Sequence, residues 1–157
     1  EDGDGSLTPA PDDECDPENL DEPRDGSKRA MHVSGSWSGT DLEWIAAFGF
    51  PLEHDEEPVD ASGYAGVTFY AKTDDDETAV RLQVMIDDVR DEGHFAIELS
   101  LTSSWQEYTV LWDDERLIQP SWANPETFDP ATLFKLQFQF DSESFDMWVD
   151  DIRFVEP

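Results

Sequence analysis

The chain has 157 residues, of which 39 are Asp or Glu and nine are Lys or Arg, so its formal net charge at pH 7 is −30. A surface this acidic repels nucleic acid phosphates and anionic lipid headgroups, which argues against nucleic acid and membrane partners. Ten Phe, six Trp and three Tyr still supply enough apolar area for a packed core. The length suits one ordinary domain, so we expect a single domain over residues 1–157.

The acidic excess fits two settings, both outside the cell. In a salt-rich habitat extra carboxylates favour solubility, because the Debye length falls to about 3 Å at 1 M salt and their repulsion is screened. A secreted domain that binds several calcium ions has a similar composition. Cys15 is the single cysteine, so no disulfide within the chain is expected. No apolar run approaches the ~20 residues of a membrane span, and we expect a secreted protein whose signal peptide was removed before Glu1.

Residues 1–29 differ from the rest of the chain in composition. Leu7 and Leu20 are their only large aliphatic side chains, set among Asp, Glu, Pro and Gly. Such a segment buries too little apolar surface to order itself. We therefore predict an acidic loop or insertion over residues 6–29.

From Ala30 onward, apolar and polar residues alternate in short runs separated by turns rich in Asp, Gly, Ser and Pro. A period of two is typical of a β-strand with one buried face. Strands are expected over residues 67–72, 79–86, 94–101, 105–112, 133–140 and 145–154, with weaker candidates at 30–34 and 42–48. This number of strands with hairpin-length connections predicts an all-β fold, a two-sheet antiparallel β-sandwich or jelly roll.

The alternation also assigns each strand residue to the core or to an outer face. The outward positions combine aromatic rings with planar hydrogen-bonding groups: Tyr70, Arg81, Gln83, His94, Glu98, Gln137, Gln139, Asp146 and Trp148. Sugars need this combination, since their C–H faces stack on rings and their hydroxyls pair with carboxylates, amides and guanidinium groups. An ordinary solvated sheet face would carry many of the same polar residues.

The tryptophans carry different weight in this interpretation. Trp148 is the most informative, because a large aromatic ring at a polar strand position asks for a reason. Trp105 and Trp112 bracket a strand and are expected in the core or at its edge. Trp122 lies in a Pro-rich loop, where it either pins that loop or lines the rim of a binding site.

Two adjacent carboxylates, Asp150 and Asp151, interrupt the last predicted strand. Val149, Ile152 and Phe154 can share one face only if the strand has a β-bulge at these carboxylates. Carboxylates beside a core are costly unless something neutralises them, and a calcium ion would do so. The alternative is a pair of surface carboxylates on an edge strand. No EF-hand or zinc pattern is present in the sequence.

Several short strings resemble those of family 11 carbohydrate-binding modules, which have a galactose-binding-like jelly-roll fold. The closing strand FDMWVDDIRF (145–154) carries most of the resemblance. It is joined, in matching order, by DASGYAG (60–66), GYAGVTFYAK (63–72), WQEYTV (105–110), QPSW (119–122), LFKLQF (133–138) and the opening EDGD (1–4). The resemblance spans nearly the whole chain, and the acidic insertion near the start departs from the family pattern.

The resemblance implies a non-catalytic module that binds a polysaccharide, most simply a β-glucan-like chain, in a shallow cleft on one sheet. It also implies a structural calcium between a first-strand carboxylate and the last strand, here Glu1 and Asp150, with Asp151 and Asp4 as further candidates. An attached glycoside hydrolase domain is a further expectation, because modules of this kind accompany such enzymes.

Two other functions fit the same residues. A calcium-dependent surface or adhesion domain would need no sugar specificity. A jelly-roll polysaccharide lyase or hydrolase would use Tyr70, Arg81, Gln83 and His94 on a concave sheet, although the −30 charge opposes uronic acid substrates. The shape of the sheet that carries Tyr70 and Trp148 is expected to separate the carbohydrate-binding module from the adhesion domain.

Overall fold

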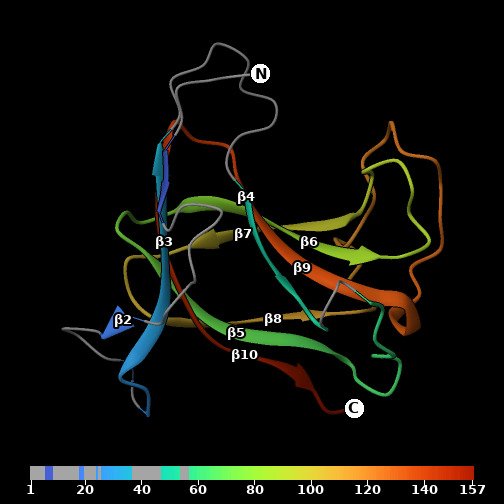
Figure 1. The fold of residues 1–157 in the computed structure, drawn as a ribbon, viewed down its shortest axis with the longest axis horizontal. Coiled ribbons are helices and arrows are strands. Elements are labelled where there is room, and N and C mark those ends of the chain that lie inside the picture. The colour runs from blue at the N-terminus through green and yellow to red at the C-terminus, as the bar shows by residue number, and fades with distance from the viewer. Residues whose placement is uncertain (1–5, 9–17, 20–23, 25, 37–46, 54–56) are drawn as a thin grey trace.

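The computed structural model describes residues 6–8, 18–19, 24, 26–36, 47–53 and 57–157 (Figure 1). These residues form an all-β sandwich of two antiparallel sheets, as predicted. In Figure 1, β5, β8 and β10 run below β6, β7 and β9, with the two layers face to face. The helical structure of the described part is a single 3-10 turn at Pro130–Thr132, and no helix there is long and apolar enough to cross a membrane.

The six-stranded sheet has the order β1-β3-β10-β5-β8, and β2 pairs with β3 beside this path. Its strands are β1 (Ser6–Thr8), β2 (Glu18–Asn19), β3 (Arg29–Ser36), β5 (Gly66–Thr73), β8 (Gln106–Leu111) and β10 (Ser144–Val155). The four-stranded sheet has the order β4-β9-β6-β7. Its strands are β4 (Ala47–Pro51), β6 (Thr78–Ile86), β7 (Phe95–Leu101) and β9 (Leu133–Phe140).

The core lies between the inner faces of the two sheets. Phe69 of β5 and Phe138 of β9 are each 1% exposed and meet edge to face with ring centroids 5.2 Å apart. Near one end of the sandwich, Phe140 of β9 stacks on Phe145 of β10 at 3.9 Å. Burying aromatic rings of this size is a major source of stability for a β-sandwich core.

All six strongly predicted strands are confirmed, and the weaker candidate at 30–34 lies within β3. The weaker candidate at 42–48 meets β4 only at Ala47 and Phe48, and residues 42–46 lie outside the described part. Within the segment predicted as an acidic loop or insertion, residues 6–29, the short strands β1 and β2 pair with β3 at the edge of a sheet. These strands pair through their backbones, which an apolar period of two does not reveal.

The predicted bulge in the last strand is confirmed. The pairing of β10 with β5 shifts register between Asp150 and Arg153, and Asp151 has a φ of 51°. Val149, just before the bulge, is buried in the core. After Asp151 the strand again alternates more exposed and less exposed side chains, now shifted by one residue.

Candidate functional site

Polar side chains form two parallel rows on the outer face of the four-stranded sheet. One row runs Gln139–Arg81–Glu98 and the other runs Gln137–Gln83–Ala96, each across β9, β6 and β7 in direct cross-strand register. Within the second row the Nε2 of Gln137 donates a hydrogen bond to the Oε1 of Gln83 at 2.9 Å. Gln83 is only 7% exposed, so this amide forms the floor of the face.

A loop over residues 118–126 forms a wall along the β7 edge of this face. Ile118 begins the wall by exchanging two backbone hydrogen bonds with Ala96, of 3.0 and 3.1 Å. The wall carries two large exposed apolar side chains, Ile118 at 61% and Trp122 at 55%. Exposed apolar area beside an amide floor is unusual for a solvated sheet, and it is a typical feature of a ligand site.

Two hollows share Gln83, Glu92 and Trp122, so the indole stands between them. The larger hollow, of about 710 Å³, lies over the β7 edge, and the smaller, of about 450 Å³, extends over β9. Together they form what we call the cleft, lined by Arg81, Gln83, Asp91, Glu92, His94, Glu98, Glu115, Arg116, Ile118, Gln119, Trp122, Gln137 and Gln139. Volumes of this size are in the range of small-molecule binding sites.

The wall is held in place by a polar network beneath it. The carboxylate of Asp91 accepts hydrogen bonds from the backbone N of Asn124 at 2.7 Å and its Nδ2 at 2.6 Å, and from the N of Gly93 at 3.1 Å. The amide of Gln119 donates to the carbonyl of Gly93 at 2.7 Å and accepts from the N of Glu126 at 2.7 Å. Trp122 is therefore presented by an anchored loop.

Two ionisable groups of the cleft are shifted by their surroundings. The hydrogen bonds from Asn124 and Gly93 lower the pKa of Asp91, so this carboxylate stays ionised. Burial lowers the pKa of His94, against the opposing attraction of Glu92 and Asp91. The Nδ1 of His94 is buried and has no hydrogen-bond partner among the described residues, which also disfavours the protonated ring.

The cleft brings together six of the nine residues predicted to bind sugar, namely Arg81, Gln83, His94, Glu98, Gln137 and Gln139. The expectation of one shared cleft is wrong for Tyr70, Asp146 and Trp148, which lie on β5 and β10 of the other sheet. Alternation places a residue on an outer face, but it does not say which sheet of the sandwich carries that face.

The outer face of the six-stranded sheet is occupied by its own side chains. Trp148 lies between its cross-strand neighbours His32 and Lys72, with the His32 ring stacked at 4.2 Å and the Lys72 Nζ 4.7 Å from the indole centroid. The Nε2 of His32 lies 2.6 Å from Asp146. The guanidinium of Arg24 covers Tyr70 at 4.0 Å from the ring centroid. Neither ring is presented bare to a sugar.

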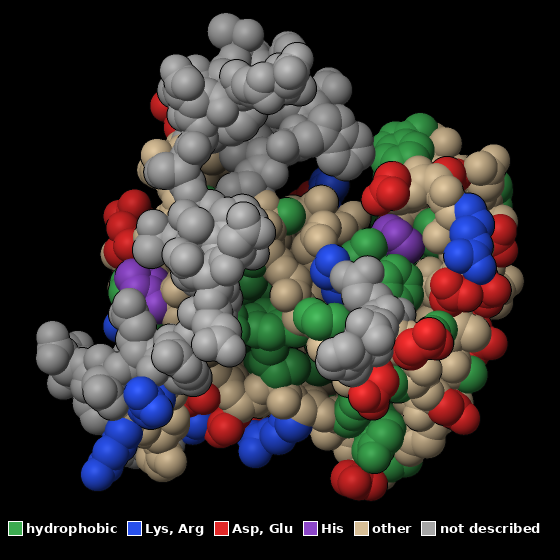
Figure 2. All heavy atoms as spheres, in the orientation of Figure 1, with side chains coloured by type: hydrophobic (Ala, Val, Ile, Leu, Met, Phe, Trp, Pro, Cys, Tyr) green, Lys and Arg blue, Asp and Glu red, His purple; other side chains and the backbone are tan. Residues whose placement is uncertain are grey.

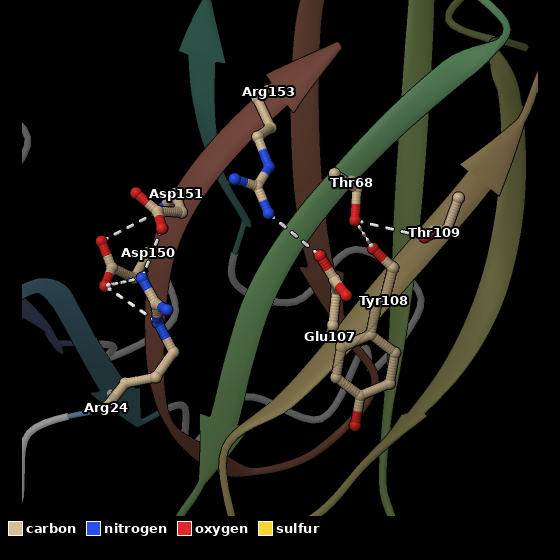
Figure 3. Close-up of polar contacts among 8 residues, drawn as sticks. All are labelled: Arg24, Thr68, Glu107, Tyr108, Thr109, Asp150, Asp151 and Arg153. Atoms are coloured by element: carbon tan, nitrogen blue, oxygen red, sulfur yellow. Dashed lines mark hydrogen bonds and ion pairs between the residues drawn. The ribbon is translucent and has the colours of Figure 1, made fainter. Parts of the chain in front are cut away.

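The predicted calcium ligands fall at the bulge of β10. Glu1 lies outside the described residues, as does Asp4. Asp150 and Asp151 both pair with the guanidinium of Arg24 (Figure 3). The same guanidinium also stacks on the Tyr70 ring. In the described part of the chain no group of three or more acidic, His or Cys side chains is placed to hold a metal ion. The two carboxylates at the bulge are paired with a guanidinium of the protein itself.

Sequence patterns left open or missed the residues of the wall. Trp122 had two equally weighted roles, and its 55% exposure beside both hollows places it on the rim of the cleft. No sequence pattern marks Asp91 or Ile118 as part of a site, and Gln119 enters the resemblance only as the first residue of QPSW. Their roles depend on contacts between two loops more than 20 residues apart in the sequence. The periodicity of a strand does not reveal such contacts.

No family model matches the chain, and no curated protein matches it in sequence. Solved structures do match in fold. The family 11 carbohydrate-binding module from Clostridium thermocellum, in complex with a β-1,3-1,4-mixed-linked tetrasaccharide, has a TM-score of 0.63 at 16% identity, covering 99% of this chain and 85% of that one. A family 30 carbohydrate-binding module has a TM-score of 0.65 at 13% identity, covering 98% and 91%.

An exo-β-agarase also matches, with a TM-score of 0.61 at 13% identity, covering 92% of this chain but only 22% of the agarase chain. At these identities the likeness concerns the fold. The chain has the two-sheet jelly-roll fold of the family 11 and family 30 carbohydrate-binding modules, as the sequence resemblance implied.

Gly93 provides a test of how the wall is anchored. A Cβ at this position would lie 2.2 Å from the Cβ of Ala123 and 2.9 Å from the Oδ1 of Asp91, so Gly93→Ala must push the two loops apart. We expect the free energy of unfolding to fall by about 1–3 kcal/mol, measured by urea denaturation. Amide exchange should accelerate at Ile118, whose N–H bonds to Ala96. Gly63→Ala is the matched control, because nothing lies within 4 Å of its Cβ. Equal effects of the two substitutions would contradict the close packing.

His94 predicts a pH dependence of stability. Because its pKa is lower in the folded protein than its ordinary value of 6.5, the unfolded chain takes up this proton first as the pH falls. The stabilising contribution is complete above pH 6.5 and is lost as the pH falls below it. Urea denaturation from pH 8 to pH 5 should show the wild type losing stability relative to His94→Gln. Parallel curves for the two proteins would contradict a depressed pKa.

Proposed function

We propose that the chain is a non-catalytic carbohydrate-binding module that holds a neutral polysaccharide, most simply a β-glucan, in the cleft. The observation that carries the proposal is the amide floor of Gln83 and Gln137 beside the exposed indole of Trp122. The fold, shared with solved carbohydrate-binding modules, supports it.

The floor offers both donors and acceptors to sugar hydroxyls. The bond between Gln137 and Gln83 uses one of two N–H groups of Gln137 and leaves the Gln83 NH₂ and the Gln137 carbonyl with capacity for a ligand. Arg81 and Glu98, 3.5 Å apart and both exposed at the surface, add a cation and an anion to the neighbouring row. Vicinal hydroxyls, which donate and accept at once, suit such alternating partners.

The charges around the cleft favour a neutral chain over an acidic one. Asp91, Glu92, Glu98 and Glu115 outnumber Arg81 and Arg116 among its lining residues. A uronate or sulfated polysaccharide would approach against this local charge and against the −30 of the whole chain. An open cleft of this kind supports millimolar to micromolar binding, roughly −4 to −8 kcal/mol.

The proposed lyase constellation gains no support from the geometry. Arg81, Gln83 and His94 line the cleft, but Tyr70 lies on β5 of the opposite sheet beneath Arg24. An attached glycoside hydrolase remains part of the proposal, and the agarase is an example of this fold as a small part of a longer enzyme chain. The adhesion alternative predicts no glycan binding at all.

The decisive binding experiment compares the two outer faces. Isothermal titration calorimetry against mixed-linkage β-glucan, cellulose oligosaccharides, agarose and alginate should show binding to at least one neutral glycan and none to alginate. Trp122→Ala should weaken that binding at least about tenfold, or 1.4 kcal/mol, because it removes the exposed ring of the cleft. Trp148→Ala makes the same change on the opposite sheet and should leave affinity within twofold.

Loss of binding on Trp148→Ala with none on Trp122→Ala would move the site to the six-stranded sheet. Failure to bind any neutral glycan would sink the proposed function and favour the adhesion domain. Release of soluble sugar from any of these polymers would instead establish an enzyme.

We also propose that the protein works outside the cell in a salt-rich setting. The chain has 39 acidic and nine basic residues, and Figure 2 shows acidic side chains interspersed with basic ones on the described part of the visible face. The crowded carboxylates repel one another, and salt screens this repulsion. The thermal midpoint should therefore rise as sodium or potassium chloride increases well beyond 0.5 M, where ordinary surface electrostatics is already screened. Differential scanning calorimetry from 0.1 to 3 M salt measures this. A midpoint that is flat above about 0.5 M would contradict the salt adaptation.

A further inference from the structure

The bulge of β10 concentrates negative charge beside the core. The side chain of Asp150 is only 14% exposed, and that of Asp151, in the left-handed region at φ 51°, is 48% exposed. The backbone N of Asp151 donates to the Oδ1 of Asp150 at 2.9 Å, which fixes the first carboxylate against the strand. A nearly buried carboxylate in a chain of charge −30 needs a cation close to it.

Arg24 supplies that cation. Its Nη2 and Nε lie 3.1 and 3.3 Å from the Oδ2 of Asp150, and its Nη2 also contacts the Oδ2 of Asp151 (Figure 3). Its guanidinium carbon lies 4.0 Å from the centroid of the Tyr70 ring, and its side chain is only 11% exposed. One planar group thus satisfies two carboxylates and stacks on an aromatic face, which an ammonium ion cannot do equally well.

We propose that Arg24 is a built-in replacement for a bound cation: it neutralises the bulge of β10 and fastens the segment before β3 to the last strand. The fold then needs no calcium at this position. This inference concerns stability and does not depend on the proposed glycan binding.

The chemistry of calcium supports exclusion of the ion while Arg24 is in place. Calcium requires six to eight oxygen ligands, and the Asp150 oxygen that faces outward already accepts two N–H groups of Arg24. A divalent ion and a guanidinium sharing two carboxylates would also repel each other at short range. Burial opposes the charge of Arg24, but the hydrogen bonds and charges of Asp150 and Asp151 outweigh it and raise its pKa, so the cation is permanent.

The first test is thermal unfolding of Arg24→Met, which keeps the aliphatic stem and removes the charge. We expect the midpoint to fall by about 3–10 °C, given the cost of leaving partly buried carboxylates unpaired. Arg153→Met is the matched control, because Arg153 lies on β10 with Asp150 and Asp151 and pairs with Glu107 at 3.1 Å, but both side chains of that pair are about half exposed. It changes the net charge equally and should shift the midpoint by less than about 2 °C.

Asp150→Asn is a second test, because the proposal and general charge repulsion predict opposite changes in the thermal midpoint. General repulsion in so acidic a chain predicts that losing a carboxylate raises the midpoint, as we expect for the exposed Asp113→Asn control. The proposal predicts a lower midpoint for Asp150→Asn, and no further drop when it is combined with Arg24→Met. Additive shifts, or a rise for Asp150→Asn, would overturn it.

The third test measures the effect of calcium on the thermal midpoint. The wild-type midpoint should be the same in EDTA and in 5 mM calcium chloride when sodium chloride matches the ionic strength. A saturable calcium increment that Asp150→Asn abolishes would overturn the proposal and establish the calcium site predicted from the sequence.

Discussion

The contact of Phe69 with Phe138 is the one on which the rest of the sandwich depends. These rings, one from each sheet, are almost fully buried and meet edge to face in the middle of the core. Because the two sheets bury their apolar inner faces against each other, each sheet has only its outer face available to bind a ligand or other parts of the chain. What covers that outer face then decides what each sheet can do.

The two outer faces differ in how their polar and aromatic side chains are covered. On the six-stranded sheet, Arg24 lies on Tyr70, and His32 and Lys72 flank Trp148, so the polar and aromatic groups already satisfy one another. A ligand there would have to replace contacts that the protein makes without it. On the four-stranded sheet, amides, a guanidinium and an indole line two open hollows. A ligand there gains contacts and gives up mainly water.

Strand positions and the core-facing residues of β5, β6, β9 and β10 could be predicted from the sequence, because apolar residues alternate there and a one-residue slip would expose the core. The burial of Gln83 and Met85, at outward positions of β6, could not. The bulge at Asp150 could be predicted from the same rule. How the outward residues are divided between the two sheets could not be predicted, since β10 pairs with β3 and β5 while β9 pairs with β4 and β6. Adjacent strands in sequence thus belong to different layers.

Two further features rest on contacts between distant segments and leave no local pattern. The wall that presents Trp122 is held by Asp91 and Gln119 acting between two loops. Arg24 lies in a segment whose composition indicates only solvated loop, yet it reaches a strand 126 residues away. The alternation of the last strand singled out the carboxylates at the bulge, but it gave no sign that Arg24 pairs with them.

The division of labour between the sheets can be tested most directly by NMR, by titrating isotopically labelled protein with the neutral glycan that binds best. The account predicts that the side-chain amide signals of Gln83, Gln137 and Gln139 and the indole N–H of Trp122 shift together and saturate together. The indole N–H of Trp148 should stay unchanged. Saturable shifts at Trp148 and its neighbours with a silent glutamine floor would contradict the account.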